Sequence, residues 1–463
     1  MPNYTYDLPK NYYFGGGGDT FAPPLAIAIL AAAGLLILML PRKHAIVPFL
    51  IAAMVVPLHV TVVIATLHFD SVRLLVLVGL IRVLARGERF PGRLTVFDRA
   101  VFYSAICNAV MYCLLWREVG AIVNRFGFLL TVLGAYLLLR CLVRDKADVI
   151  RMIKAFAFVF VLIAPFMWRE AVTDHNAFSL LGSPELSEIR NGRIRAEGPF
   201  AHAIIAGTVG AVWLPLFVGL WWYQRSGRWI AAAGALASTV MMFASASSTP
   251  VMTYPAAILG LAMWPARKRM QLVRWGIVGL LIALQLCMKA PVWFVIDRVS
   301  GFLGGSGWHR AMLIDNFIRH FFEWCLIGTR NNGSWGWSMW DVDNAYVGAG
   351  LSGGLLNFIL FIAVLVYGYR IIGVARRSAE RSRRDARFIW AIGAALFANS
   401  VAFFGIVYFD QSVFAWYALL ATIALVPTFV PAARVAPPEP VALDELPAEP
   451  TYAIANSQGM WSV

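Results

Sequence analysis

Runs of roughly twenty apolar residues recur along this 463-residue chain and constrain its fold more than any other feature. A helix needs about that length to cross the hydrocarbon of a bilayer. About thirteen such runs are present, near residues 23–40, 45–66, 72–85, 100–116, 119–139, 149–168, 200–222, 229–245, 249–264, 273–289, 344–368, 387–407 and 412–430. The sequence therefore predicts an all-α fold, a polytopic transmembrane helix bundle of about 12–14 spans.

Arginines in two of these runs affect how the runs are interpreted. The third is short and includes Arg73 and Arg82, which suggests a tilted, re-entrant or half span. The fifth contains Arg125, whose guanidinium must lie near an interface or face the bundle interior.

Composition agrees with a membrane protein. The chain is 60% hydrophobic and 14% charged, whereas soluble domains are nearer a quarter charged. The five cysteines fall mostly within the apolar runs and show no Cys/His metal-ligand spacing, so neither a disulfide framework nor a metal site is expected. No internal repeat is evident, which weakens the hypothesis of an inverted-repeat transporter.

Basic residues suggest the orientation. Lysines and arginines concentrate in alternate loops, most densely between Arg376 and Arg387, and such loops are usually cytoplasmic. This places the N-terminus outside and the C-terminus inside. The net charge of +14 then reflects topology and contact with anionic membrane lipids, and no nucleic-acid partner is expected.

The predicted organisation has three parts. Residues 1–22 form an extracytoplasmic N-terminal segment without the basic start of a signal peptide. Residues 23–430 form the transmembrane domain, with large extracytoplasmic loops at 169–200 and 289–343. Residues 431–463 are rich in proline and acids and are expected to be a disordered cytoplasmic tail.

The first large loop ends with three arginines, Arg190, Arg193 and Arg195, just before an expected helix. Pro199 suits the first turn of that helix. A helix N-terminus favours anions, and guanidinium groups add paired donors for phosphate. Two interpretations remain open. The arginines form an anion site that includes Arg195, or they contact lipid headgroups or pair with nearby acids, namely Glu185, Glu188 and Glu197.

The second large loop contains a segment, 308–324, with helical amphipathic spacing. The apolar side comprises Leu313, Ile314, Phe317, Ile318, Phe321 and Phe322, and the polar side comprises His309, Asn316, His320 and Glu323. We expect this helix to lie in the membrane interface. Asp315 and Arg319 have i, i+4 spacing and are expected to pair, whereas Arg310 has no local partner and is the better ligand candidate.

A glycine-rich loop follows this helix. Trp335, Trp337 and Trp340 form either an aromatic belt at the membrane interface or stacking surfaces for sugar rings. Asp341 and Asp343 have the spacing of a metal-pyrophosphate pair, but two acids alone are a weak match. Asp343 at the mouth of a span is a candidate general base.

These segments, taken in order, resemble the O-antigen ligase and O-antigen polymerase family. The resemblance is carried by Arg195-Ala-Glu-Gly-Pro-Phe-Ala-His202, by Arg310 on an apolar helix, by Asp343-Asn-Ala-Tyr346, and by the glycine-rich run from Gly350 to Leu356. It covers roughly residues 100–430. It implies a multi-span glycosyltransferase that takes a glycan from an undecaprenyl-pyrophosphate carrier at the outer face of the bacterial inner membrane, without nucleotide sugar, cofactor or metal.

Two departures qualify the resemblance. Asp343 stands where ligases of the family typically have a histidine, and Ser247-Ser248-Thr249-Pro250 lacks an arginine that many members carry. These differences indicate either a polymerase or exopolysaccharide-type member or a diverged member of the family, and a polysaccharide polymerase is slightly favoured over a ligase. The implied partners are the lipid-linked glycan donor, an acceptor glycan or lipid, and other assembly proteins such as a chain-length regulator.

The resemblance, together with the charge pattern, predicts a two-part site. Arg195, Arg310 and Asp343 are the predicted catalytic residues. The predicted substrate-binding residues are Arg193, His202, His309, Arg319, Asn344 and Tyr346. Two other functions remain: a flippase or exporter for lipid-linked glycans, which would carry its cations within the spans, and a non-catalytic envelope scaffold.

Overall fold

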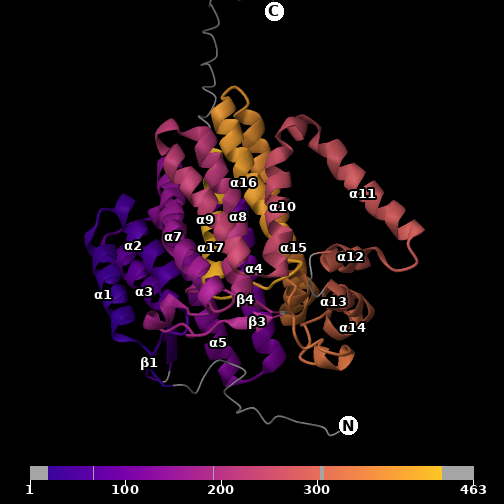
Figure 1. Cartoon of the computed structure of the whole chain (residues 1–463), viewed down its shortest axis with the longest axis horizontal. Coiled ribbons are helices and arrows are strands. Elements are labelled where there is room, and N and C mark those ends of the chain that lie inside the picture. The colour runs from indigo at the N-terminus through magenta and orange to yellow at the C-terminus, as the bar shows by residue number, and fades with distance from the viewer. Residues whose placement is uncertain (1–18, 66, 191, 303–306, 430–463) are drawn as a thin grey trace, which may run out of the picture. The chain divides into compact units, whose positions relative to one another are not determined.

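The computed structural model describes residues 19–429 except 66, 191 and 303–306, and within helix α12 it leaves the side chains of residues 299–302 undescribed. The expected N-terminal segment lies almost wholly outside these residues, as does the expected tail. The described chain is an all-α polytopic helix bundle with two small β-hairpins (Figure 1). The predicted fold class is confirmed.

The helices occupy most of the chain. In the first half they are α1 Pro24–Met39, α2 Arg42–Val55, α3 Ser71–Ala85, α4 Val96–Trp116, α5 Val119–Leu129, α6 Ala135–Leu142, α7 Lys146–Thr173, α8 Ala203–Tyr223 and α9 Arg228–Ala244. In the second half they are α10 Ser248–Ala262, α11 Met270–Cys287, α12 Val295–Phe302, α13 Gly307–Arg319, α14 Phe321–Trp324, α15 Ala345–Ser378, α16 Arg383–Ala402 and α17 Gln411–Leu425.

Each of the thirteen predicted runs contains a helix. Among the described residues, eight helical segments are long and apolar enough to cross a membrane: Val96–Trp116, Val119–Leu142, Lys146–Thr173, Ala203–Tyr223, Arg225–Ala244, Trp264–Cys287, Ala345–Ser378 and Gln411–Phe429. The other runs correspond to the shorter or more polar helices α1, α2, α3, α10 and α16. The protein is therefore a multi-pass membrane protein.

The second predicted run is only partly a helix. Helix α2 ends at Val55, and the chain then forms an antiparallel hairpin of β1 Thr61–Ile64 and β2 Leu67–Asp70. Valine, isoleucine and threonine dominate β1, and these β-branched residues favour an extended strand once helical packing ends. The prediction of a span reaching residue 66 is therefore wrong.

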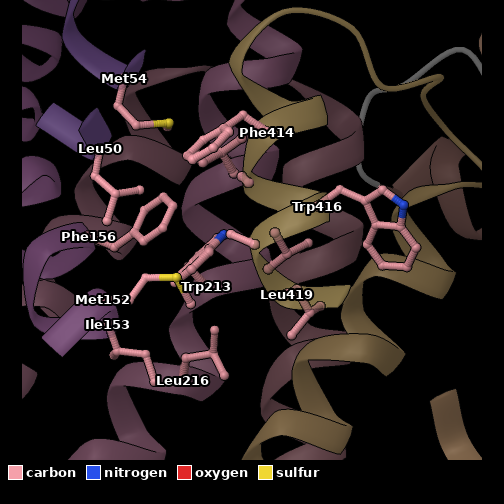
Figure 2. Close-up of a cluster of buried hydrophobic side chains, with 14 of the residues drawn as sticks. Leu50, Met54, Met152, Ile153, Phe156, Trp213, Leu216, Phe414, Trp416 and Leu419 are labelled. Carbon is pink, nitrogen blue, oxygen red and sulfur yellow. The ribbon is translucent and has the colours of Figure 1, made fainter. Parts of the chain in front are cut away.

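The core is formed by large aromatic and aliphatic side chains between α2, α7, α8 and α17 (Figure 2). Phe156 stacks on Trp213 with ring centres 3.6 Å apart, and Phe414 lies edge-on to Phe49 at 5.0 Å. Helix α8 is the most enclosed of the spans and packs against α9, α10 and α16. This rigid centre fixes the loops at the ends of α7, α8 and α10.

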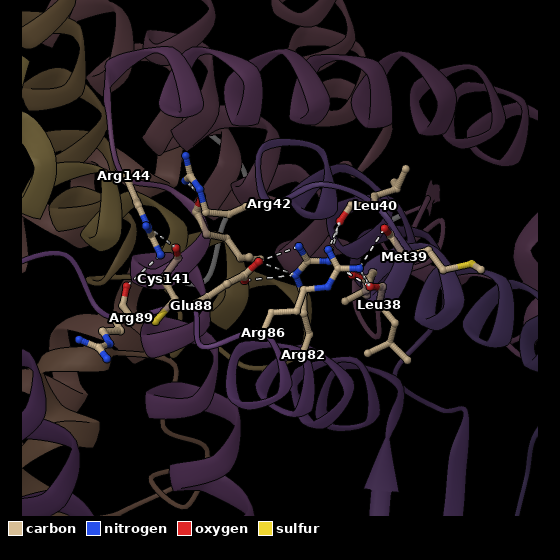
Figure 3. Close-up of polar contacts among 12 residues, drawn as sticks. Leu38, Met39, Leu40, Arg42, Arg82, Arg86, Glu88, Arg89, Cys141 and Arg144 are labelled. Carbon is tan, nitrogen blue, oxygen red and sulfur yellow. Dashed lines mark hydrogen bonds and ion pairs between the residues drawn. The ribbon is translucent and has the colours of Figure 1, made fainter.

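Arg82 in the third run and Arg86 just after it have partners within the fold. Arg82 is fully buried and pairs with Glu88 at 2.7 Å, and it also donates to the carbonyls that end α1, including that of Leu40 at 2.8 Å (Figure 3). Arg86 donates to the Leu38 carbonyl at 2.6 Å. The last carbonyls of a helix have no partner within it, so these guanidiniums satisfy the end of α1.

Helix α15 is interrupted near its start. Gly354 has φ 71° and ψ −170°, which a residue with a side chain adopts poorly, and a Cβ there would lie 2.4 Å from the Leu326 carbonyl oxygen. The first turns, from Ala345 to Gly353, therefore form a separate short piece. Asn344 caps this piece, so Asp343 lies just before its start.

Candidate functional site

Arg195 is placed by a hairpin of β3 Glu188–Arg190 and β4 Arg193–Arg195, which the sequence did not predict as strands. The antiparallel register sets Glu188 opposite Arg195, and the two side chains form an ion pair. The Arg195 side chain is buried, and burial lowers the pKa of its guanidinium despite the opposing effect of Glu188. The acid-pairing interpretation thus holds for Glu188.

The segment after Arg195 is fixed by carboxylates from other helices. Glu170 at the end of α7 is fully buried and accepts the backbone N–H groups of Glu197 at 2.7 Å and Gly198 at 2.9 Å. Asp410, just before α17, accepts the N–H of Ala201 at 2.8 Å. These bonds hold the turn that leads into α8, so Arg195 is attached to the rigid bundle.

Helix α8 begins later than predicted. His202 is its N-cap, and the ring Nδ1 accepts the N–H of Ile204 at 3.1 Å. Pro199 lies in the preceding turn and not in the first helical turn, because Glu170 and Asp410 keep residues 197–201 non-helical. Burial and the nearby Arg195 lower the pKa of His202, so its ring is neutral near pH 7.

Arg310 lies on α13 and is also buried. Its Nε donates to Asp343 Oδ2 at 3.2 Å, and its Nη2 donates to Thr249 Oγ1 at 2.8 Å and to Ser248 Oγ at 3.3 Å. Gly405 lies against the guanidinium, where a Cβ would be 3.2 Å from Arg310 Cζ. Arg310 has no partner nearby in the sequence, and distant segments of the chain supply its partners.

Asp343 lies between two basic groups. Its Oδ1 is 3.5 Å from Nδ1 of His309, whose Nε2 faces the Ser338 carbonyl at 2.9 Å. The hydrogen bond to Asp343 raises the pKa of His309, because the protonated ring can donate to both partners. Asp343 therefore lies between the Arg310 guanidinium and the His309 ring.

The two halves meet at the start of α10. Arg195 Nη2 donates to Ser247 Oγ at 3.3 Å, and the next two residues, Ser248 and Thr249, bind Arg310. Arg195 Nε and Arg310 Nη1 are buried without a hydrogen-bond partner. Two guanidiniums with unused donors therefore adjoin one helix N-terminus, and such an arrangement suits an anion with several oxygens.

The remaining predicted residues have other contacts. Arg193 is exposed on the hairpin, and Arg319 pairs with Asp315 at 2.6 Å, as its spacing predicted, with its side chain 70% exposed. Asn344 caps α15 through the N–H groups of Tyr346 and Val347. The Tyr346 hydroxyl donates to the Ser400 carbonyl at 2.8 Å. Asn344 and Tyr346 thus have clear roles in the fold, and their substrate-binding role stays a prediction.

The predicted helix 308–324 is broken at His320, between α13 and α14. The break splits the expected apolar side: Leu313 and Phe317 are buried in a small core with Trp324, whereas Phe322 is 89% exposed. The prediction of one continuous amphipathic face is therefore wrong. Leu313 and Phe317 are buried because they pack near Val347 and Leu351 of α15. These contacts form only in the folded chain, so local spacing does not predict them.

The three tryptophans differ in their surroundings. Trp335 is buried, stacks on His320 with ring centres 4.9 Å apart, and donates to Glu323 at 2.8 Å. Trp337 and Trp340 are exposed. Only the latter two remain candidates for a belt or for stacking on sugars.

Sequence reasoning missed the hydroxyls that join the site. The sequence comparison singled out residues 247–249 only because they lack an arginine found in the family. Nothing in their local sequence indicates that Arg195 and Arg310 bind their hydroxyls. Glu170 had a usable signal, since an acid at the end of an otherwise apolar helix requires a partner. The chain matches no known protein-family model and no curated protein.

Proposed function

We propose that this protein transfers or polymerises glycan from an undecaprenyl-pyrophosphate-linked donor to a glycan or lipid-linked acceptor at the outer face of the bacterial inner membrane. Polymerisation is favoured over ligation. The enzyme would be a metal-independent glycosyltransferase.

One observation carries the proposal: Arg195 and Arg310, far apart in sequence, bind consecutive hydroxyls at the start of α10. Each guanidinium keeps one buried nitrogen without a partner. A pyrophosphate has several charged oxygens, and two guanidiniums supply paired donors of matching geometry. The free N–H groups at the start of α10 add to the same positive potential.

In the proposed reaction an acceptor hydroxyl attacks the anomeric carbon of the donor sugar. A new carbon–oxygen bond forms, the bond from that carbon to the pyrophosphate breaks, and the hydroxyl proton passes to Asp343. Arg195 and Arg310 stabilise the charge that develops on the leaving pyrophosphate. Most of the negative charge in this step develops on the departing pyrophosphate. The base therefore needs to accept the hydroxyl proton only late in the step.

Asp343 and Arg310 would act in sequence. Before substrate binds, the 3.2 Å contact between them keeps each charge neutralised. A pyrophosphate that engages Arg310 would compete with Asp343 for the same guanidinium, which would free the carboxylate to accept the hydroxyl proton. His309, 3.5 Å from Asp343, orients the carboxylate through its contact with the Ser338 carbonyl.

The proposal is tested with Arg310→Ala in a host that lacks the native gene. We expect at least about a 100-fold loss of polymer or ligated product, comparable to removal of a donor that stabilises a developing oxyanion. Arg310→Lys should also be poor, since an ammonium cannot make paired contacts. Arg319→Ala on the same helix is the comparison variant, because Arg319 is exposed and paired with Asp315, and a loss of product there would support its predicted substrate-binding role instead. Normal product from a folded Arg310→Ala protein would overturn the proposal.

The identity of the accumulated intermediate separates the candidate functions. Loss of a polymerase leaves lipid-linked single repeats on the outer face of the membrane, whereas loss of a ligase leaves completed lipid-linked polymer. Loss of a flippase or exporter instead leaves lipid-linked repeats on the cytoplasmic face. Protection of the repeats from an externally added glycosidase distinguishes this last outcome and would contradict the proposal.

A further inference from the structure

A second cationic cluster lies at the C-terminal end of α4, apart from the residues of the candidate site. The Arg125 Cζ on α5 is 3.6 Å from the ring centre of Tyr112 on α4. The Arg330 Cζ, in the loop before α15, is 4.8 Å from the ring centre of Trp116. The two rings are themselves 5.8 Å apart. They form one aromatic platform with a guanidinium against each end.

The polar contacts of this cluster leave its charge unneutralised. Arg125 Nη1 donates to Asn108 Oδ1 at 2.9 Å, and its Nε is buried without a partner. Arg330 donates through Nε and Nη2 to the Leu115 carbonyl, at 3.1 and 2.8 Å. Across the described parts of the chain, neither guanidinium forms an ion pair with a carboxylate.

The apolar side of α5 beside Arg125 indicates which kind of anion can reach the two arginines. Helix α5 exposes a row of apolar side chains beside Arg125, among them Val119, Ile122 and Phe126. Arg125 lies six residues beyond the start of α5, about 9 Å along its axis, whereas Arg330 is in a loop. The two charges thus extend from the end of the bundle into the apolar region. A lipid whose phosphate reaches this depth can neutralise both.

We propose that Arg125 and Arg330 bind the phosphate of a membrane lipid, with the lipid chain lying along the exposed apolar side of α5. The aromatic rings hold the guanidiniums in place and leave their outer edges to the phosphate oxygens. The phosphate can come from an anionic phospholipid or from a prenyl phosphate. The site does not depend on the glycosyltransferase function.

Native mass spectrometry of the full-length protein, released from detergent, tests the proposal. The probes are phosphatidylglycerol, undecaprenyl phosphate, diacylglycerol without phosphate, and inorganic phosphate. We expect Arg330→Gln to weaken binding of at least one phosphate lipid by about tenfold. Arg117→Gln should leave lipid binding unchanged, because Arg117 is exposed and, among the described residues, its guanidinium donates to the Leu114 carbonyl at the end of α4.

Each outcome is decisive. A selective loss for phosphatidylglycerol identifies bulk phospholipid as the occupant, and a selective loss for undecaprenyl phosphate identifies a prenyl carrier. Equal binding of both lipids by Arg330→Gln and the parent protein overturns the proposal. Displacement of the lipids by millimolar inorganic phosphate also overturns it, because the site would then take phosphate from solution. Arg330 is exposed, so its replacement should leave the packed core in place, and the thermal midpoint of the variant in detergent checks this.

Discussion

Arg82 and Arg310 are both almost completely buried, yet their surroundings differ. Every nitrogen of the Arg82 guanidinium has a partner, either Glu88 or a carbonyl at the end of α1. Arg310 binds one carboxylate and two hydroxyls, and its Nη1 has no partner. A guanidinium whose donors are all satisfied completes a fold, whereas one with an unused donor beside displaceable partners is suited to a ligand.

The partners also differ in how easily they can be exchanged. Backbone carbonyls that end a helix cannot leave Arg82 without unwinding α1. The partners of Arg310 are side chains, and Asp343 is 17% exposed. Burial alone therefore does not distinguish Arg82 from Arg310, and we expect the identity of their partners to do so.

Arg82→Ala should have the largest effect on stability. The substitution leaves Glu88 and several buried carbonyls unpaired, which costs about 3–5 kcal/mol in comparable buried pairs. We expect a strongly lowered thermal midpoint in detergent or no recoverable protein. Arg310→Ala, measured beside it, should keep most of the parent's midpoint while it loses product. Similar midpoints for the two variants would remove the distinction drawn between these arginines.

Thr249→Val should reduce product by about tenfold at unchanged expression. The substitution keeps the side-chain shape but removes the hydroxyl that Arg310 binds at 2.8 Å, and a hydrogen bond to a charged group contributes about 1.5–3 kcal/mol. Product yield from membranes of the variant is the measurement. Ser248→Ala should cost less, since its contact with Arg310 is longer at 3.3 Å. The reverse order would show that Thr249 does not position Arg310.

The sequence was sufficient for the fold class and for selecting charged residues as candidates for a site. Apolar runs of about twenty residues indicate spans directly, because a helix needs that length to cross the hydrocarbon. Arg195, Arg310 and Asp343 stood out as charged residues in the two large polar loops between the runs. The strands at Glu188–Arg190 and Arg193–Arg195 were missed since three-residue strands have too little periodicity to detect. The hydroxyls of Ser247 to Thr249 were missed because their role arises only when two distant loops meet.

Glu197→Gln should change how stability depends on pH. Burial, together with Glu170 and Glu188, raises the pKa of Glu197 to about 7 from its ordinary 4.5. The folded state thus binds this proton more tightly than the unfolded state, and the stabilisation is lost as pH rises through about 7. The thermal midpoint of the parent should fall between pH 5 and pH 8 more than that of the glutamine variant. If the thermal midpoints of the parent and the glutamine variant fell equally with pH, ionisation of Glu197 would not destabilise the folded protein.

Arg319→Ala should have the smallest effect and sharpens the comparison most directly, because Arg319 and Arg310 lie on the same helix. The Arg319 side chain is 70% exposed, and such ion pairs contribute about 0–1 kcal/mol. Its partner Asp315 keeps a second hydrogen bond, from Trp293 Nε1 at 3.2 Å. Product and midpoint should both stay within about twofold and a few degrees of the parent. If Arg319→Ala abolished product as Arg310→Ala is expected to, any disturbance of α13 would suffice, and the loss at Arg310 would no longer identify a pyrophosphate ligand.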